Sequence, residues 1–187
     1  MQVSFRSVGA EDGYVVESSE SSGVGGAANA NGGQVRAGDY AANRQVKGIV
    51  SFDTSSIPDG ATVVSATLRL RRQSVRGANP FGVLGRCWID VQTGGFGGST
   101  ALQAADFEAS ATAARAGTLS NAARRGEWST GTLGAAGLAA INRTGRTQLR
   151  IAFELDDNNN RRQDTIGWTS GDRKPAVRPE LVVTYVE

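Results

Sequence analysis

The segment Ala61–Arg72, with the sequence ATVVSATLRLRR, has the clearest alternation of apolar and polar residues in the chain. Successive side chains of a β-strand point to opposite faces of the sheet, so this period of two predicts a half-buried strand. The face expected to meet the core carries Val64, Ala66, Leu68 and Leu70. The opposite face carries Ser65, Thr67, Arg69 and Arg71. One face of the predicted strand is therefore apolar, and the other is partly cationic.

Other segments show the same alternation and are separated by clusters of Gly, Asn, Asp and Ser, which favour turns. These segments are residues 12–17, 46–53, 85–92, 147–155 and 179–187. Within 147–155, the residues expected to face the core are Leu149, Ile151, Phe153 and Leu155. Because strands dominate and the predicted helices are short, the sequence predicts an all-β fold, an antiparallel β-sandwich or jelly roll.

Two segments of low complexity interrupt the strand pattern. Residues 18–38 are small, polar and rich in glycine, so we expect a long surface loop or a flexible excursion there. Residues 100–128 form an alanine-rich excursion, in which 101–109 are expected to form a short helix. A second short helix is expected over 133–143. With 187 residues and no internal repeat, the chain 1–187 is expected to be a single domain.

The composition narrows the classes of function. With 20 basic and 18 acidic residues the formal net charge is +2, too small for a global field that attracts nucleic acid, and we expect no nucleic-acid partner. The chain has no histidine, which excludes Ser/His and Cys/His catalysis and imidazole-rich metal sites. No spacing singles out a catalytic group, so we expect no enzymatic activity. No segment has the ~20 apolar residues of a membrane span, and the N-terminus lacks a signal-peptide pattern.

A more specific pattern surrounds the turn that precedes the predicted strand. The segment 52–71, FDTSSIPDGATVVSATLRLR, resembles the DNRLRE domain family, whose members show a strand ending in Phe-Asp, a turn of the type SSIP-x-GAT and a strand beginning SAxLxL. The matching residues are Phe52, Asp53, Ser55, Ser56, Ile57, Pro58, Gly60, Ala61, Thr62, Ser65, Ala66, Leu68 and Leu70. Segments 141–160 and 178–185 are similar as well, whereas Lys47 stands where an arginine is expected.

The resemblance implies a β-sandwich module of secreted or cell-surface proteins. Such modules are often attached to polysaccharide-active enzymes, and some are classed with carbohydrate-binding modules that recognise acidic polysaccharides such as alginate. The expected function is therefore non-catalytic binding of an acidic polysaccharide, at an extracellular or cell-surface location. The alternative is a structural or assembly module of an extracellular surface, filament or virion, whose Gly- and Ala-rich excursions contact neighbouring subunits of a homo-oligomer.

Binding of an acidic polysaccharide requires cationic side chains for its carboxylates and aromatic side chains for the apolar faces of its sugar rings. The candidate ligand-binding residues are Lys47, Arg69, Arg71, Arg150, Trp128 and Trp168. The four cations alternate outward on predicted strands, and two neighbouring strands would align them in a ladder. The alternative for these cations is a solvated face that prevents edge-to-edge pairing. The alternative for Trp168 is a position in the core, whereas Trp128 is expected to be exposed.

A run of Asp and Asn residues before two arginines offers oxygen ligands of the kind that calcium prefers. Asp156, Asn158 and Asn160 match the first three ligands of an EF-hand loop. Arg161 and Gly167 occupy the positions that require glycine and glutamate, so a complete EF-hand is excluded. Two alternatives stay open. One is a structural calcium ion that takes its remaining ligands from Glu11 and Asp12 or from Asp164, and the other is a polar turn without metal. The candidate metal ligands are Glu11, Asp12, Asp156, Asp157 and Asn158.

Overall fold

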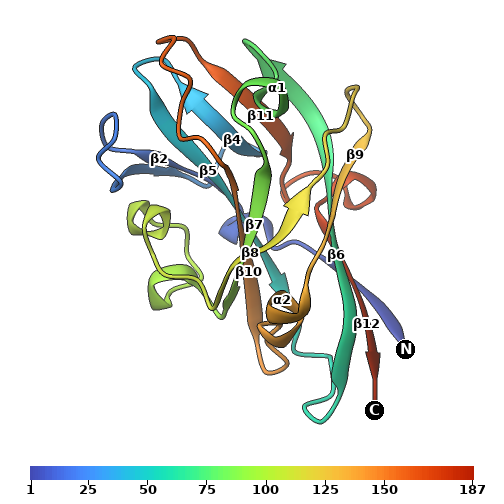
Figure 1. The fold of residues 1–187 in the computed structure, drawn as a ribbon. Coiled ribbons are helices and arrows are strands. Elements are labelled where there is room, and N and C mark those ends of the chain that lie inside the picture. The colour runs from blue at the N-terminus through green and yellow to red at the C-terminus, as the bar shows by residue number, and fades with distance from the viewer.

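A computed structural model describes all residues from 1 to 187, and Figure 1 shows its fold, a curled sheet of 12 strands. The strands are β1 (Gln2–Arg6), β2 (Gly13–Glu17), β3 (Gly25–Asn29), β4 (Gln34–Tyr40), β5 (Arg44–Asp53), β6 (Thr62–Arg76), β7 (Cys87–Thr93), β8 (Ala113–Leu119), β9 (Trp128–Thr132), β10 (Arg146–Phe153), β11 (Asp164–Thr169) and β12 (Glu180–Val186). The helices are short: α1 (Pro80–Val83), α2 (Ala135–Ala139), η1 (Gly9–Glu11), η2 (Phe96–Gly98), η3 (Ala104–Phe107) and η4 (Pro175–Val177). The predicted all-β fold is confirmed.

The sheet forms two layers because the 15-residue strand β6 belongs to both of them. Its first half pairs with β12 and β9, and its second half pairs with β11. One layer has the order β1-β12-β6-β9, and the other continues β6-β11-β4-β5-β10-β7-β8, with β2 and β3 attached at β5. All pairings between named strands are antiparallel. Since β1 pairs with β12, the two termini lie close together (Figure 1).

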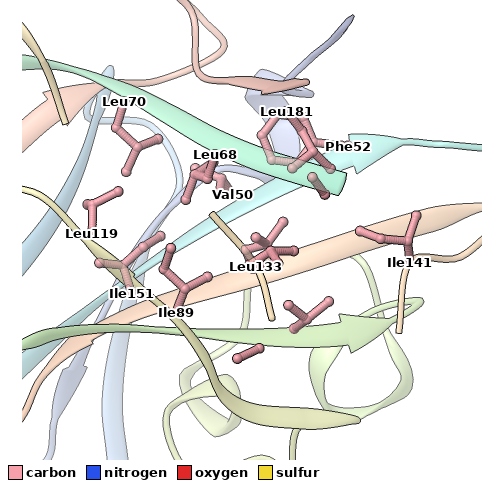
Figure 2. Packing of buried hydrophobic residues seen from close by; sticks show 14 of the residues in the cluster. Val50, Phe52, Leu68, Leu70, Ile89, Leu119, Leu133, Ile141, Ile151 and Leu181 are labelled. Carbon is pink, nitrogen blue, oxygen red and sulfur yellow. The ribbon is translucent and has the colours of Figure 1, made fainter. Parts of the chain in front are cut away.

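The space between the layers is filled by a core of 28 buried residues. Figure 2 shows Leu68 and Leu70 of β6 opposite Ile89 of β7 and Ile151 of β10, and all four side chains are fully buried. Each side chain of this size contributes roughly 1.5–3 kcal/mol by its transfer out of water. The single cysteine, Cys87, is also buried there as a free thiol. The alternation that predicted these strands therefore identified most of the inward faces correctly.

The sequence prediction was wrong at Val64 and Leu155, which are 48% and 49% exposed. On β12, Thr184 pairs with Ser65 and Tyr185 with Val63, so Val64 is the extra residue of a β-bulge and leaves the core face. Leu155 lies beyond the last residue of β10, where the alternation of the strand no longer applies.

The structure also corrects the two excursions. Residues 18–38 contain β3 and most of β4, and Val35 and Ala37 within this range are fully buried, so the range is not one long surface loop. β3 pairs with β2 through its backbone, although its sequence GGAAN has no apolar pattern. Within 101–109 only the 3-10 turn η3 forms, whereas the helix expected over 133–143 is present as α2.

Candidate functional site

The predicted ladder of four cations does not form, because its members lie in opposite layers. Lys47 of β5 and Arg150 of β10 belong to the layer that contains β7 and β8. Arg69 and Arg71 lie in the half of β6 that pairs with β12 and β9. Outward side chains of the two layers of a sandwich point away from each other, so one ligand cannot contact all four residues.

Lys47 and Arg150 are neighbours, but the segment that contains η3 covers both of them. Lys47 Nζ and Arg150 Nη1 donate to the same carbonyl oxygen, that of Phe107, at 2.9 and 3.3 Å. Arg150 also forms an ion pair of 2.8 Å with Asp90 and is only 8% exposed. Burial, together with the nearby charge of Arg150, lowers the pKa of Lys47 to about 8. These two cations hold η3 against the sheet and are not an open binding surface.

The two aromatic candidates lie in different environments. Trp168 is fully buried, and its Nε1 donates to Ser129 Oγ at 3.0 Å, so it is a core residue. Trp128 is half-buried at the start of β9, where it pairs with Arg71. The guanidinium carbon of Arg69 lies 4.9 Å from the centre of its ring. Of the two candidates, only Trp128 has surface available to a ligand.

Arg71 lies in a surface cleft between β6, the loop before β9 and the segment that follows β11. The volume of the cleft is about 420 Å³, which lies within the roughly 300–1,000 Å³ of ligand pockets. We call it the arginine cleft, and its lining residues are Arg71, Arg72, Gln73, Arg125, Gly126, Thr169, Arg173 and Val177. Three segments that are distant in the sequence thus bring four arginines to one place.

The four arginines of the cleft differ from other arginines of the chain in their partners. None of them forms an ion pair, whereas four arginines elsewhere in the chain, Arg6, Arg69, Arg146 and Arg150, do so. Three of the four instead donate to backbone carbonyl oxygens: Arg71 Nε to Gly126 at 2.9 Å, Arg72 Nη1 to Ala122 at 2.7 Å, and Arg173 Nε to Gly33 at 3.1 Å. A guanidinium has five N–H donors, so these bonds orient the groups and leave charge and donors for an anion.

A second group of arginines lies further along the outer face of β4 and β11. Arg36 Nη1 donates to Tyr40 Oη at 3.2 Å, and the Arg36 guanidinium lies 5.1 Å from the centre of the Tyr14 ring. On β11, Gly167 pairs with Arg36, and Thr169, which lines the arginine cleft, lies two residues further along the strand. The two groups therefore share one face of the sheet. The residues that line the second depression are Arg36, Tyr40, Ala41, Arg44, Arg76 and Gln163.

Three arginines of the cleft, Arg72, Arg125 and Arg173, were not among the residues predicted from the sequence. A signal was present, because each of them lies beside another basic residue, in Arg71-Arg72, Arg124-Arg125 and Arg173-Lys174. Lys and Arg are almost never fully buried without a partner, so two adjacent cations mark a surface position. The sequence contains no sign, however, that Arg125 and Arg173 meet Arg71 and Arg72 in the fold.

The two halves of the predicted calcium site lie far apart. Asp12 accepts a hydrogen bond of 3.0 Å from the backbone N–H of Ser51, near one end of β5. The loop between β10 and β11 contacts the other end, where the backbone N–H of Arg161 donates to Asn43 Oδ1 at 2.9 Å. From Arg44 to Ser51 the strand spans roughly 23 Å at about 3.3 Å per residue. One ion, with ligands at about 2.3–2.6 Å, cannot bridge that distance.

Glu11 and Asp12 already have partners within the protein. Glu11 forms an ion pair of 3.1 Å with Arg146. Asp12 is fully buried, and its Oδ2 accepts hydrogen bonds from Ser7 Oγ at 2.6 Å and from the backbone N–H of Gly171 at 2.8 Å. Burial raises the pKa of Asp12 to about 7, although these hydrogen bonds act in the opposite direction. Both carboxylates join the β1–β2 connection to the rest of the fold.

The other three predicted ligands lie in the loop between β10 and β11. Asp156 is exposed, Asp157 is buried, and Asn158 Nδ2 donates to Asp164 Oδ2 at 2.7 Å. Asp164 was predicted as an alternative ligand, whereas its strand neighbour Asp39 was not predicted as a site residue. Burial raises the pKa of Asp39 to about 6, and the adjacent charge of Asp164 acts in the same direction. No group of three or more His, Cys, Asp or Glu side chains is arranged to hold a metal ion.

Comparison with known proteins adds no family to this description. No protein-family model matches the chain, and no curated protein matches it. The resemblance to the DNRLRE domain family therefore stays a prediction from the sequence motif. No helix in the structure combines the length and the apolar character that crossing a membrane requires.

Proposed function

We propose that this protein is a non-catalytic module that binds an acidic polysaccharide in the arginine cleft. The observation that carries the proposal is that four arginines line one cleft and that none of them forms an ion pair with a carboxylate. Arginine binds a carboxylate through two parallel hydrogen bonds, so the carboxylates of a uronic acid chain suit the free donors of the cleft. An extracellular or cell-surface location, as the motif implies, belongs to the same proposal.

A polymer fits this surface better than a small anion does. Arg72 in the cleft and Arg76 in the second group lie four residues apart on β6, which corresponds to roughly 13 Å along a strand. A chain with repeated carboxylates can contact both groups, whereas a single small anion reaches one of them. The half-buried ring of Trp128, opposite Arg71, offers an apolar surface for a sugar ring beside the cleft.

The test is electrophoresis in gels that contain polygalacturonate or the same polymer with its carboxylates fully methyl-esterified. We expect the acidic polymer to retard the wild-type protein and the esterified polymer to have no effect. The double substitution Arg71→Gln with Arg173→Gln should weaken binding roughly a hundredfold or more, because each charged hydrogen bond contributes about 1.5–3 kcal/mol. Equal retardation by the two polymers would oppose a role for the arginines.

A matched control removes the same charge from the other layer. Arg86 and Arg115 both lie over the ring of Trp88, with guanidinium carbons 5.8 and 5.2 Å from the ring centre. The double substitution Arg86→Gln with Arg115→Gln also lowers the net charge by two. It should leave retardation by polygalacturonate within about twofold of wild type. If both double variants lose binding equally, the attraction is a property of net charge, and the cleft is not the site.

A further inference from the structure

Four carboxylates at one end of β2, β4 and β11 are buried without a cationic partner. They belong to Glu17, Asp39, Asp157 and Asp164, whose exposed fractions are 2, 0, 7 and 2%. None of them is part of an ion pair. The charge of Asp157 acts on Asp39, and that of Glu17 acts on Asp157, so the groups lie within electrostatic reach of one another. Buried charges in proteins are paired or coordinate metals. The charge of Arg162 acts on Asp164, but Arg162 forms no ion pair with any of the four carboxylates.

The two oxygens of the Asp39 carboxylate differ in their hydrogen bonding. Its Oδ1 accepts a hydrogen bond of 3.2 Å from the backbone N–H of Asp164. Its Oδ2 is buried and accepts no hydrogen bond of normal geometry, although the backbone N–H of Asn158 lies near enough to the carboxyl to oppose the rise in its pKa that burial causes. Leaving a buried charged acceptor without a partner costs more than the roughly 1–3 kcal/mol of an unsatisfied neutral group. Asp39 Oδ2 is therefore a buried acceptor that no side chain of the protein satisfies.

Asp164 lies beside Asp39, since the two residues are direct partners across β4 and β11. Asp164 Oδ2 accepts hydrogen bonds from Asn158 Nδ2 at 2.7 Å and from Asn160 Nδ2 at 2.8 Å. Two buried carboxylates and two carboxamides thus meet at the base of the loop between β10 and β11. We infer that Asp39, Asp164, Asn158 and Asn160 bind one calcium ion, with waters and backbone carbonyls completing its ligands.

The two carboxamides suit the ion when their oxygens face it. The oxygen and nitrogen of an Asn side chain exchange places by a half-turn, and the arrangement seen here is the one that satisfies Asp164 in the absence of a cation. The half-turn gives up four hydrogen bonds. Two are the bonds from the carboxamides to Asp164 Oδ2, and two are the bonds from the backbone N–H of Asn160 to Asn158 Oδ1 at 3.2 Å and of Arg162 to Asn160 Oδ1 at 2.6 Å. Coordination of the carboxylate and both carboxamide oxygens to a doubly charged ion offsets the loss of these four bonds.

The surrounding backbone holds Asp164 in a fixed position. Gly38 has φ of 132°, and a Cβ there would overlap the carbonyl oxygen of Asp164. Gly77 has φ of 70°, and a Cβ there would overlap the carbonyl oxygen of Gln163 and the carboxylate of Asp164. Asp164 Oδ1 accepts the backbone N–H of Ala78 at 2.6 Å. This fixed position of the Asp164 side chain favours ion binding, because a coordinating group that is already in place loses little conformational entropy when the ion binds.

The ligand chemistry selects calcium among the common ions. All four side chains offer oxygen, and the site has neither the histidine nor the cysteine that zinc and copper prefer. Magnesium requires a near-ideal octahedron and retains several waters, whereas calcium accepts 6–8 oxygens in irregular geometry. Two carboxylates neutralise a divalent ion. This site is separate from the arginine cleft, and the inference does not rest on the proposed glycan binding.

The test is calcium titration of the full chain after removal of metals with a chelator, followed by calorimetry and thermal unfolding. We expect one calcium ion per chain in calorimetry, a rise in Tm with calcium, and a much smaller rise with equal magnesium. Asp39→Asn should abolish both the binding and the rise in Tm. Without calcium it should unfold at the wild-type Tm or above, because it removes one of two adjacent buried charges.

Two further variants make the outcome decisive. Asn160→Ala changes an exposed residue of the loop, and we expect it to raise the calcium Kd at least tenfold while the protein remains folded. Asp59→Asn removes an exposed carboxylate elsewhere and should bind calcium as wild type does. The inference is overturned if wild type binds no calcium, or if Asn160→Ala and Asp59→Asn bind it equally well.

Discussion

Trp168 Nε1 donates a hydrogen bond of 3.0 Å to Ser129 Oγ, and both side chains are fully buried. Trp168 belongs to β11 and Ser129 to β9, and both strands pair with β6, but in different halves of it. The bond therefore joins the two layers at the point where β6 passes from one to the other.

Ser129→Ala should lower the free energy of unfolding by about 1–3 kcal/mol, because the buried indole N–H loses its only partner. Urea unfolding followed by tryptophan fluorescence measures the loss. Retardation of the folded variant by polygalacturonate should equal that of wild type. If Ser129→Ala weakens glycan binding without lowering stability, Trp168 contributes to ligand binding, and its assignment as a core residue only is wrong.

Arg150→Gln should destabilise the protein by about 3–5 kcal/mol, because it leaves Asp90 without its buried ion-pair partner. It also removes the donors that hold the carbonyl oxygens of Asp106 and Ala109, each at 2.8 Å. Asp90→Asn should cost less, since Arg150 keeps those carbonyl partners. Thermal unfolding of both variants measures the order, and a stable Arg150→Gln protein that binds polygalacturonate poorly would contradict the anchoring role.

Stability should fall as the pH rises from about 4 to above 7 because of Asp12. Burial raises the pKa of Asp12 in the folded protein to about 7, whereas an unfolded Asp titrates near 3.9. The folded state thus holds a proton that the unfolded chain has lost in this range, and ionisation of Asp12 favours unfolding. Urea unfolding at pH 4.5, 6 and 8, with chelator present, should show a steeper decline for wild type than for Asp12→Asn. Parallel pH profiles would contradict the assignment.

Most strands could be predicted from the sequence because their side chains alternate, but two features escaped the pattern for physical reasons. Val64 follows the alternation and is exposed, since a bulge on β6 inserts one residue that β12 does not match. β3 consists of Gly, Ala and Asn, and only its backbone pairing with β2 makes it a strand. A register shift and a backbone-only pairing leave no trace in hydrophobic periodicity.

The candidate site was harder to predict, because surface residues acquire their neighbours from distant segments. The outward positions of Lys47 and Arg150 were identified correctly, yet the chain around Phe107 folds over them. Arg125 and Arg173 come from loops and meet Arg71 only through the tertiary fold. Sequence spacing specifies which face of a strand a residue occupies, but not what covers that face.

Trp128→Ala should weaken binding of polygalacturonate by about three- to tenfold with little loss of stability. The ring lies opposite Arg71 on the neighbouring strand and is half-buried, so part of its surface is available to a sugar ring; aromatic contacts of this kind contribute roughly 0.5–1.5 kcal/mol. Trp88→Ala is the matched control, because Trp88 is also half-buried but lies on β7 in the other layer. Isothermal titration with galacturonate oligomers measures both variants. If the two substitutions weaken binding to the same extent, the sugar does not contact Trp128, and recognition at the cleft rests on the arginines alone.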